Sequence, residues 1–180
     1  SGGKGKYAAI QIEIGPSDSD IEGLQFINEI SGGAIPKEFI PSIEKGFTNC
    51  MQHGLLGYPI QSLKVRLIDG DFHPVDSDPY SFELCAKEAF RTIISSCEPY
   101  LLEPIMSAQI IVPEIYTGSV VSDLSKRNGI ISELTDKGVF KSIQVHVPVS
   151  KMFGYMTDLR TITSGRGDFT MEFSHYQKAE

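Results

Sequence analysis

The sequence predicts two small α+β domains in one chain of 180 residues. Apolar residues alternate at every second position in some segments, which is typical of half-buried strands. In other segments they recur every three or four residues, which is typical of amphipathic helices. Glu98 and Pro99 separate the two halves, because a residue before proline disfavours helical backbone and ends the pattern that precedes it. We therefore expect one domain at residues 1–100 and another at residues 101–180.

The first half combines three expected strands with two expected helices. In the first strand, every second residue from Ala8 to Ile14 is small or apolar. The first helix places Ile43, Phe47 and Met51 on one face. Asp78 is a suitable N-cap for the second helix, because its carboxylate can accept a hydrogen bond from the first helical turn. Strands are expected at residues 7–14, 24–30 and 62–69, and helices at residues 41–53 and 79–96.

The second half has a regular order of elements. Strands are expected at residues 105–112, 130–135, 140–147 and 169–175, and helices at residues 113–127 and 150–164. Ser150 would cap the second of these helices, and Gly165 would close it. The order βαββαβ is that of the ferredoxin-like fold. This fold supports many functions, so it says little about activity.

Composition and charge restrict the possible functions. The chain is 41% hydrophobic and 22% charged, which is typical of a globular protein. It contains no apolar run of about 18 residues, so we expect no membrane partner. A net charge of −7 argues against non-specific nucleic-acid binding, so any contact with RNA must come from a few loops. Three cysteines without a C-x-x-C pair indicate free thiols in a reducing compartment.

No catalytic residue and no metal ligand is predicted. The glycine-rich residues 2–6 do not form a phosphate-binding loop, because Tyr7 replaces the required Ser or Thr and a strand follows. The four histidines lack the spacing of metal ligands. His73 lies in a polar loop and leaves two interpretations open. The loop is either a solvated connection or a rigid tip, stiffened by Pro74, that presents an imidazole to a ligand.

Six segments, taken in order along the chain, resemble elongation factor G. They are SGGKGKY at residues 1–7, FIN with GGAIPKEFIP at 26–28 and 32–41, DGDFHPVDS at 69–77, LLEPIM at 101–106, MFGY with TDLR at 152–155 and 157–160, and MEFSHY at 171–176. The resemblance implies domain IV at residues 1–100, without its first strand and with a β-α-β fold like that of a ribosomal protein. It implies the ferredoxin-like domain V at residues 101–180.

The same resemblance implies the partners of each domain. Domain IV would enter the decoding site of the small ribosomal subunit, where two tip loops touch tRNA and mRNA. Domain V would lie near the GTPase-associated region of the large subunit. The implied contact residues of the tip are Gly2, Gly3, Lys4, Gly5, Lys6, Tyr7, His73, Pro74, Asp76 and Ser77.

The resemblance also implies what the parent protein does. The parent would be a GTPase that binds GTP and Mg in N-terminal domains and promotes translocation of tRNA and mRNA during elongation. This part would be neither an enzyme nor a cofactor binder, and the protein would be a cytoplasmic monomer, although an organelle version is an alternative. Lys6, Ala8, Pro74 and the short segment 54–59 depart from the family pattern. They keep open a paralogue that acts in ribosome recycling or ribosomal protection.

The alternative from another functional class is an enzyme, with an active site in one of the α+β domains that the sequence does not reveal. It predicts turnover of a small molecule by this chain alone, without ribosomes.

Overall fold

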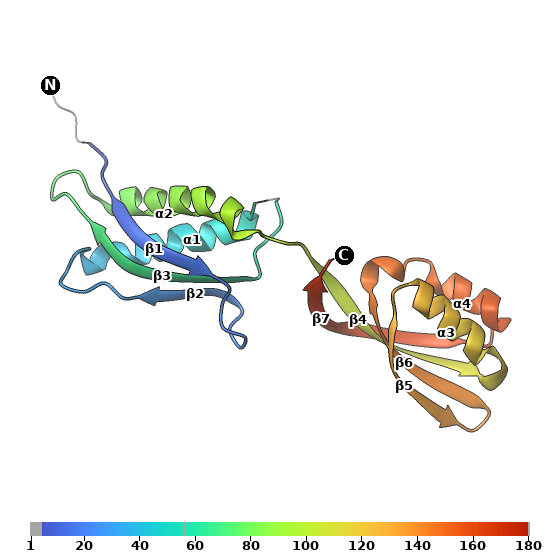
Figure 1. Cartoon of the computed structure of the whole chain (residues 1–180). Coiled ribbons are helices and arrows are strands. Elements are labelled where there is room, and N and C mark those ends of the chain that lie inside the picture. Colours follow the sequence, from blue (N-terminus) through green and yellow to red (C-terminus); the bar gives the residue numbers. More distant parts are fainter. Residues whose placement is uncertain (1–4, 56, 180) are drawn as a thin grey trace. The chain divides into compact units, whose positions relative to one another are not determined.

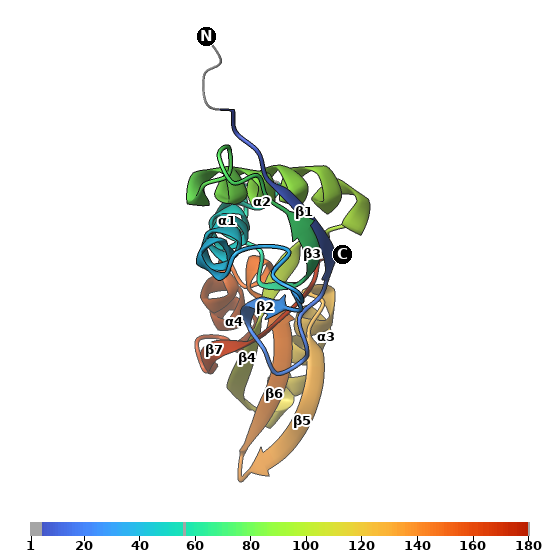
Figure 2. The same cartoon turned by 90° about the vertical axis from the view of Figure 1, so that its left-hand side faces the viewer.

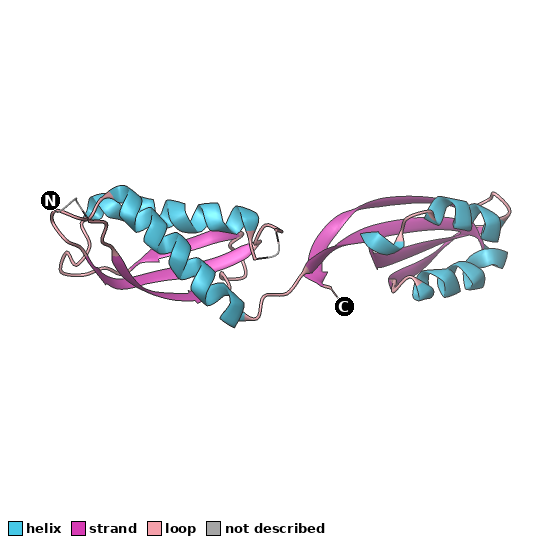
Figure 3. Cartoon of the chain, turned by 90° about the horizontal axis from the view of Figure 1, so that it is seen from above, coloured by secondary structure: helices cyan, strands magenta, loops and turns pink. Residues whose placement is uncertain are grey.

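The computed structural model describes residues 5–55 and 57–179, which divide into two compact units (Figure 1). Unit 1 comprises residues 1–99, and unit 2 comprises residues 100–180. In each unit one layer of helices covers one face of a β-sheet, as the view in Figure 3 makes clear. The expected α+β class is therefore confirmed.

Unit 1 contains a three-stranded sheet in the order β1-β3-β2. β1 (Ala9–Gly15) is antiparallel to the central β3 (Ser62–Asp71), whereas β2 (Gly23–Asn28) is parallel to it. The connection from β2 to β3 runs through α1 (Ile40–His53), and α2 (Pro79–Ile94) follows β3. The predicted alternation holds, because every second apolar side chain, such as Ile12 of β1, Phe26 of β2 and Val65 of β3, packs in the core between the sheet and the helices.

The core of unit 1 lies between the sheet and the two helices. Phe47 of α1 and Phe82 of α2 are fully buried against Val65 and Leu67 of β3. Phe82 also stacks on Phe39, with ring centroids 5.0 Å apart. The central strand β3 thus packs against both helices. This packing fixes the position of its C-terminal end, where the polar loop begins.

Unit 2 contains a four-stranded antiparallel sheet in the order β5-β6-β4-β7 (Figures 1 and 2). Its elements are β4 (Leu102–Pro113), α3 (Thr117–Lys126), β5 (Ile130–Lys137), β6 (Phe140–Pro148), α4 (Tyr155–Thr163) and β7 (Asp168–Lys178). The expected βαββαβ order is confirmed. Both helices pack on one face, over a core that includes Ile110, Leu124 and Tyr155.

Two predicted helix starts in unit 2 were wrong. The first helix begins at Thr117, because Pro113 keeps extended backbone (φ −57°, ψ 143°) as the last residue of β4, and a 3₁₀ turn follows it. The second begins at Tyr155, and Ser150 lies in a separate 3₁₀ turn without capping it. Gly154 precedes this helix with φ 75°, a conformation that glycine adopts without steric cost.

The two helices of unit 1 approach closely at Gly46. A Cβ atom at this buried position would lie 2.7 Å from the Cβ of Ala86 and 2.8 Å from the backbone oxygen of Glu83. Both neighbours belong to α2, and the second is main chain that side-chain rotation cannot move. Glycine at position 46 therefore sets the distance between α1 and α2.

We predict that Gly46→Ala lowers the free energy of unfolding of unit 1. Overpacking at a tight contact, less the helix propensity that alanine adds, gives a loss of about 1–2 kcal/mol. Calorimetric unfolding measures the effect. Gly118→Ala in α3 is the matched control, because among the described residues no heavy atom beyond its chain neighbours and its own helix backbone lies within 4 Å of the added Cβ. An equal loss in both variants would contradict the packing argument.

Candidate nucleic-acid interface

Two segments that are far apart in the sequence meet at one end of unit 1. They are residues 5–8, which lead into β1, and residues 72–78, which join β3 to α2 (Figures 1 and 2). The strand pairing brings them together, because β1 and β3 are antiparallel and Ala9 lies opposite Asp71. The start of one strand therefore lies beside the end of the other. We call these two segments together the tip.

Hydrogen bonds join the two segments of the tip. The backbone N–H of Gly5 donates to Oδ1 of Asp76 (2.9 Å), and the N–H of Tyr7 donates to the carbonyl of Asp76 (3.0 Å). Ser77 Oγ donates to the carbonyl of Tyr7 (2.7 Å), and the Tyr7 hydroxyl donates to Oδ2 of Asp71 (2.9 Å). This last bond raises the pKa of Tyr7 above its ordinary value. Each segment thus fixes the other.

The histidine of the tip is held by its own loop. The N–H of His73 donates to Ser77 Oγ (2.9 Å), and the N–H of Ser77 donates to the carbonyl of His73 (3.0 Å). The ring atom Nδ1 accepts from the N–H groups of Val75 and Asp76, each at 3.3 Å. The side chain of His73 is nevertheless 54% exposed. An exposed imidazole with a defined orientation is a suitable contact for a ligand.

Lys6 is paired rather than projecting freely from the tip. Its ammonium group forms an ion pair with Asp78 and lies 5.8 Å from the ring centroid of Tyr80. Asp78 is also the N-cap of α2, since its Oδ1 accepts from the N–H and the hydroxyl of Ser81, both at 2.7 Å. Lys6 first, and then Ser81, hold the pKa of Asp78 far below its ordinary value. One residue therefore starts a helix and anchors the glycine-rich segment.

The structure brings together most of the predicted contact residues. Gly5, Lys6, Tyr7, His73, Pro74, Asp76 and Ser77 all lie in the tip. Gly2, Gly3 and Lys4 lie outside the described residues. The sequence reasoning missed Asp71 as a partner of Tyr7, and it assigned Asp78 only a capping role. The alternation of apolar residues predicts each strand but does not predict these pairs. The pairs depend on the register between β1 and β3.

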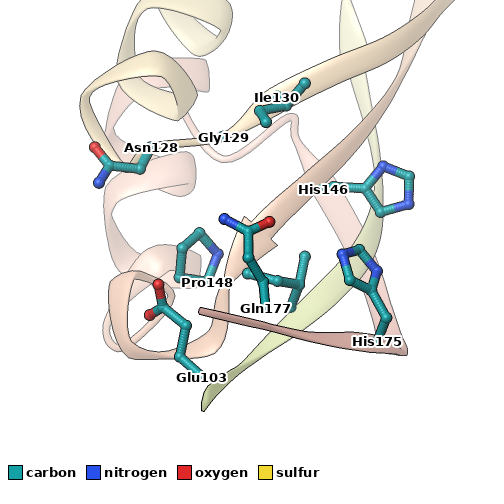
Figure 4. Close-up of a pocket in the computed structure, with 9 residues that line it drawn as sticks. Glu103, Asn128, Gly129, Ile130, His146, Pro148, His175 and Gln177 are labelled. Atoms are coloured by element: carbon teal, nitrogen blue, oxygen red, sulfur yellow. The ribbon is translucent and has the colours of Figure 1, made fainter. Parts of the chain in front are cut away.

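A shallow hollow of about 490 Å³ lies on the sheet of unit 2 (Figure 4). The rings of His146 and His175 lie next to each other in it, with centroids 6.0 Å apart, and Glu103 and Gln177 also line it. Within the described residues, no group of three or more His, Cys, Asp or Glu side chains could hold a metal ion. We assign no function to this hollow.

Comparison with known proteins identifies the family. A family model of elongation factor G, domain IV, matches residues 1–98, and a model of the elongation factor G C-terminus matches residues 100–180. The chain belongs to the elongation factor G family. No helix of the described residues is long and apolar enough to cross a bilayer.

Relatives named elongation factor G match nearly the whole chain. The protein of Amoebophilus asiaticus is 50% identical over 179 residues, which are 99% of this chain and 25% of the relative. That of Cytophaga hutchinsonii is 49% identical over 98% of this chain and 25% of the relative. That of Aquifex pyrophilus is 46% identical over 99% of this chain and 26% of the relative. The chain therefore spans about a quarter of the length of the curated relatives it matches.

A solved structure shares the fold. A crystal structure of a protein from Thermus thermophilus aligns with a TM-score of 0.80 at 29% identity. The alignment covers 97% of this chain and 29% of the other.

We predict that Asp78→Ala destabilises unit 1 in a pH-dependent way. The pKa of Asp78 is lower in the folded chain than its ordinary value of 3.8, so the ionised side chain stabilises the fold at neutral pH. This contribution is lost as the pH falls below that value. The variant should unfold a few degrees lower than the native chain at pH 7.

Thermal unfolding at pH 7 and pH 3 measures this difference. The gap between native chain and variant should narrow at the lower pH. Asp20→Ala, in the exposed loop between β1 and β2, is the matched control and should leave no gap at either pH. A gap for Asp78→Ala that does not change with pH would contradict the assigned role.

Proposed function

We propose that this chain is the ribosome-binding C-terminal part of a translational GTPase that promotes translocation of tRNA and mRNA. Unit 1 would enter the decoding site of the small subunit, and unit 2 would bind the GTPase-associated region of the large subunit. The single observation that carries the proposal is the tip, where two segments within the part that matches domain IV form one exposed and internally bonded end of unit 1.

The proposed role is mechanical. The tip would occupy the space that a tRNA leaves during translocation and so prevent its return. Such a role requires a shape that resists bending, and the hydrogen bonds of Asp76 and Ser77 between the two segments supply that resistance. We assign no bond-making step to this part of the protein. GTP and Mg would bind in the N-terminal part of the parent.

The electrostatics of the tip favour directed contacts over general attraction to phosphate. The described tip, taken with the adjoining Asp71, contains one lysine and three carboxylates, those of Asp71, Asp76 and Asp78. Each carboxylate already accepts a hydrogen bond within this region. Neutralisation of phosphates would therefore contribute little here, and recognition of RNA would depend on exposed donors such as the His73 ring. We propose a cytoplasmic monomer that associates with ribosomes.

The experiment is a toeprint on pretranslocation ribosomes with the full-length parent and GTP. The native protein should advance the messenger by one codon. His73→Ala should slow this step by about tenfold, which is the factor expected for one lost hydrogen bond. His53→Ala is the matched control, because this exposed histidine ends α1 beside the start of β3, away from the tip.

The outcomes of the toeprint separate translocation from the alternative functions. Slowing by His73→Ala but not by His53→Ala supports translocation with the tip as the contact. A native protein that binds ribosomes but leaves the messenger in place would refute translocation. Recycling or ribosomal protection would then be the better description of the parent.

A further inference from the structure

The hydrogen bonds of the tip determine which nitrogen of His73 is free. A neutral imidazole has one donor nitrogen and one acceptor nitrogen. Nδ1 lies 3.3 Å from the backbone nitrogens of both Val75 and Asp76, and both N–H groups donate to it. Nδ1 must then be the acceptor, so the proton resides on Nε2.

The competing state of His73 is a ring, neutral or charged, that carries a proton on Nδ1. Oδ2 of Asp76 lies 3.3 Å from Nδ1 of His73, so such a ring could donate to that oxygen. That form would place an N–H opposite two backbone N–H groups and deprive both of their acceptor. A ring whose only proton is on Nε2 satisfies both donors. The two backbone N–H groups therefore favour the Nε2–H form.

Asp76 and Ser77 use most of their polar atoms within the tip. Asp76 accepts from Gly5 through Oδ1 and from Tyr7 through its carbonyl, and its own N–H donates to His73. Ser77 Oγ accepts from His73 and donates to Tyr7. An ionised carboxylate is also only an acceptor, so it would repel phosphate rather than bind it.

We propose that Asp76 and Ser77 are positioning residues rather than RNA contacts. They join the two segments of the tip and hold His73 so that its Nε2–H faces outward, as a donor to an acceptor atom of RNA. The identity of RNA as the ligand rests on the proposed function. The positioning roles and the state of the ring rest on the geometry of the tip alone.

The first test determines which nitrogen of the His73 ring carries the proton. Long-range proton–nitrogen correlation spectra of the 180-residue chain, recorded at mildly alkaline pH, distinguish the two neutral tautomers of an imidazole. We expect His73 in the Nε2–H form. His53 provides an internal contrast, because its Nδ1 lies 3.2 Å from the carbonyl oxygen of Asn49 and must therefore carry the proton.

The same spectra test the positioning residues. Asp76→Ala and Ser77→Ala should convert the His73 signals to a mixture of tautomers, and Asp76→Asn should preserve the native pattern because its amide oxygen can still accept from Gly5. A mixed or Nδ1–H pattern in the native chain overturns the proposal. Native signals in both alanine variants would overturn it as well.

The second test uses the translocation rate of the full-length parent. Asp76→Ala should slow the step about tenfold, as His73→Ala does, and the double variant should be no slower than either alone, because the residues act as one unit. His73→Gln, which keeps an outward N–H, should retain most of the rate. His73→Asn, which keeps only an inner acceptor, should behave like His73→Ala. Additive losses would overturn the positioning role.

The two failures can be told apart. A parent that does not translocate, combined with the expected spectra, would overturn the proposed function and RNA as the ligand, and would leave the positioning roles standing. Unexpected spectra of the native chain would overturn the positioning roles whatever the ribosome assay gives.

Discussion

The antiparallel pairing of β1 with β3 is the constraint on which the tip depends. It places Ala9 opposite Asp71, so the segment before one strand meets the loop after the other. The register includes a bulge, since Gln11 faces Asp69 and Ile12 faces Leu67, and β3 contributes the extra residue Ile68. Ile10 and Ile12, which lie on the two sides of this bulge, both pack against the core, together with Leu67 of β3.

A second feature of β3 fixes the same region. A Cβ atom on Gly70 would lie 2.4 Å from Cδ1 of Ile35 and 2.5 Å from the carbonyl oxygen of Ala9. Only glycine allows Ile35 and β1 to approach this closely at the point where the strand leads into the tip. The position of His73 is therefore determined by packing three residues earlier in the chain, as well as by hydrogen bonds within its own loop.

Local patterns predicted most of the fold, and long-range register explains what they missed. Alternation and helical spacing depend on neighbours in the chain, so the strands and helices of both units were recognised from sequence. The pairing of Lys6 with Asp78, and of Tyr7 with Asp71, depends on how two strands align, and a slip of one residue would abolish both. α3 starts later than the sequence predicted because Pro113 belongs to β4. Its pairing with Phe140 of β6 extends that strand.

Lys6 and Pro74, which we expected to depart from the family pattern, are compatible with the proposed tip. The charge of Lys6 is balanced by Asp78, so it adds no unpaired cation to the free protein. Proline at position 74 has no N–H and a fixed φ, so it reduces the freedom of the loop before folding and leaves the N–H groups of Val75 and Asp76 to bind the imidazole. Proline at position 74 therefore supports the arrangement that orients His73, and Lys6 is compatible with it.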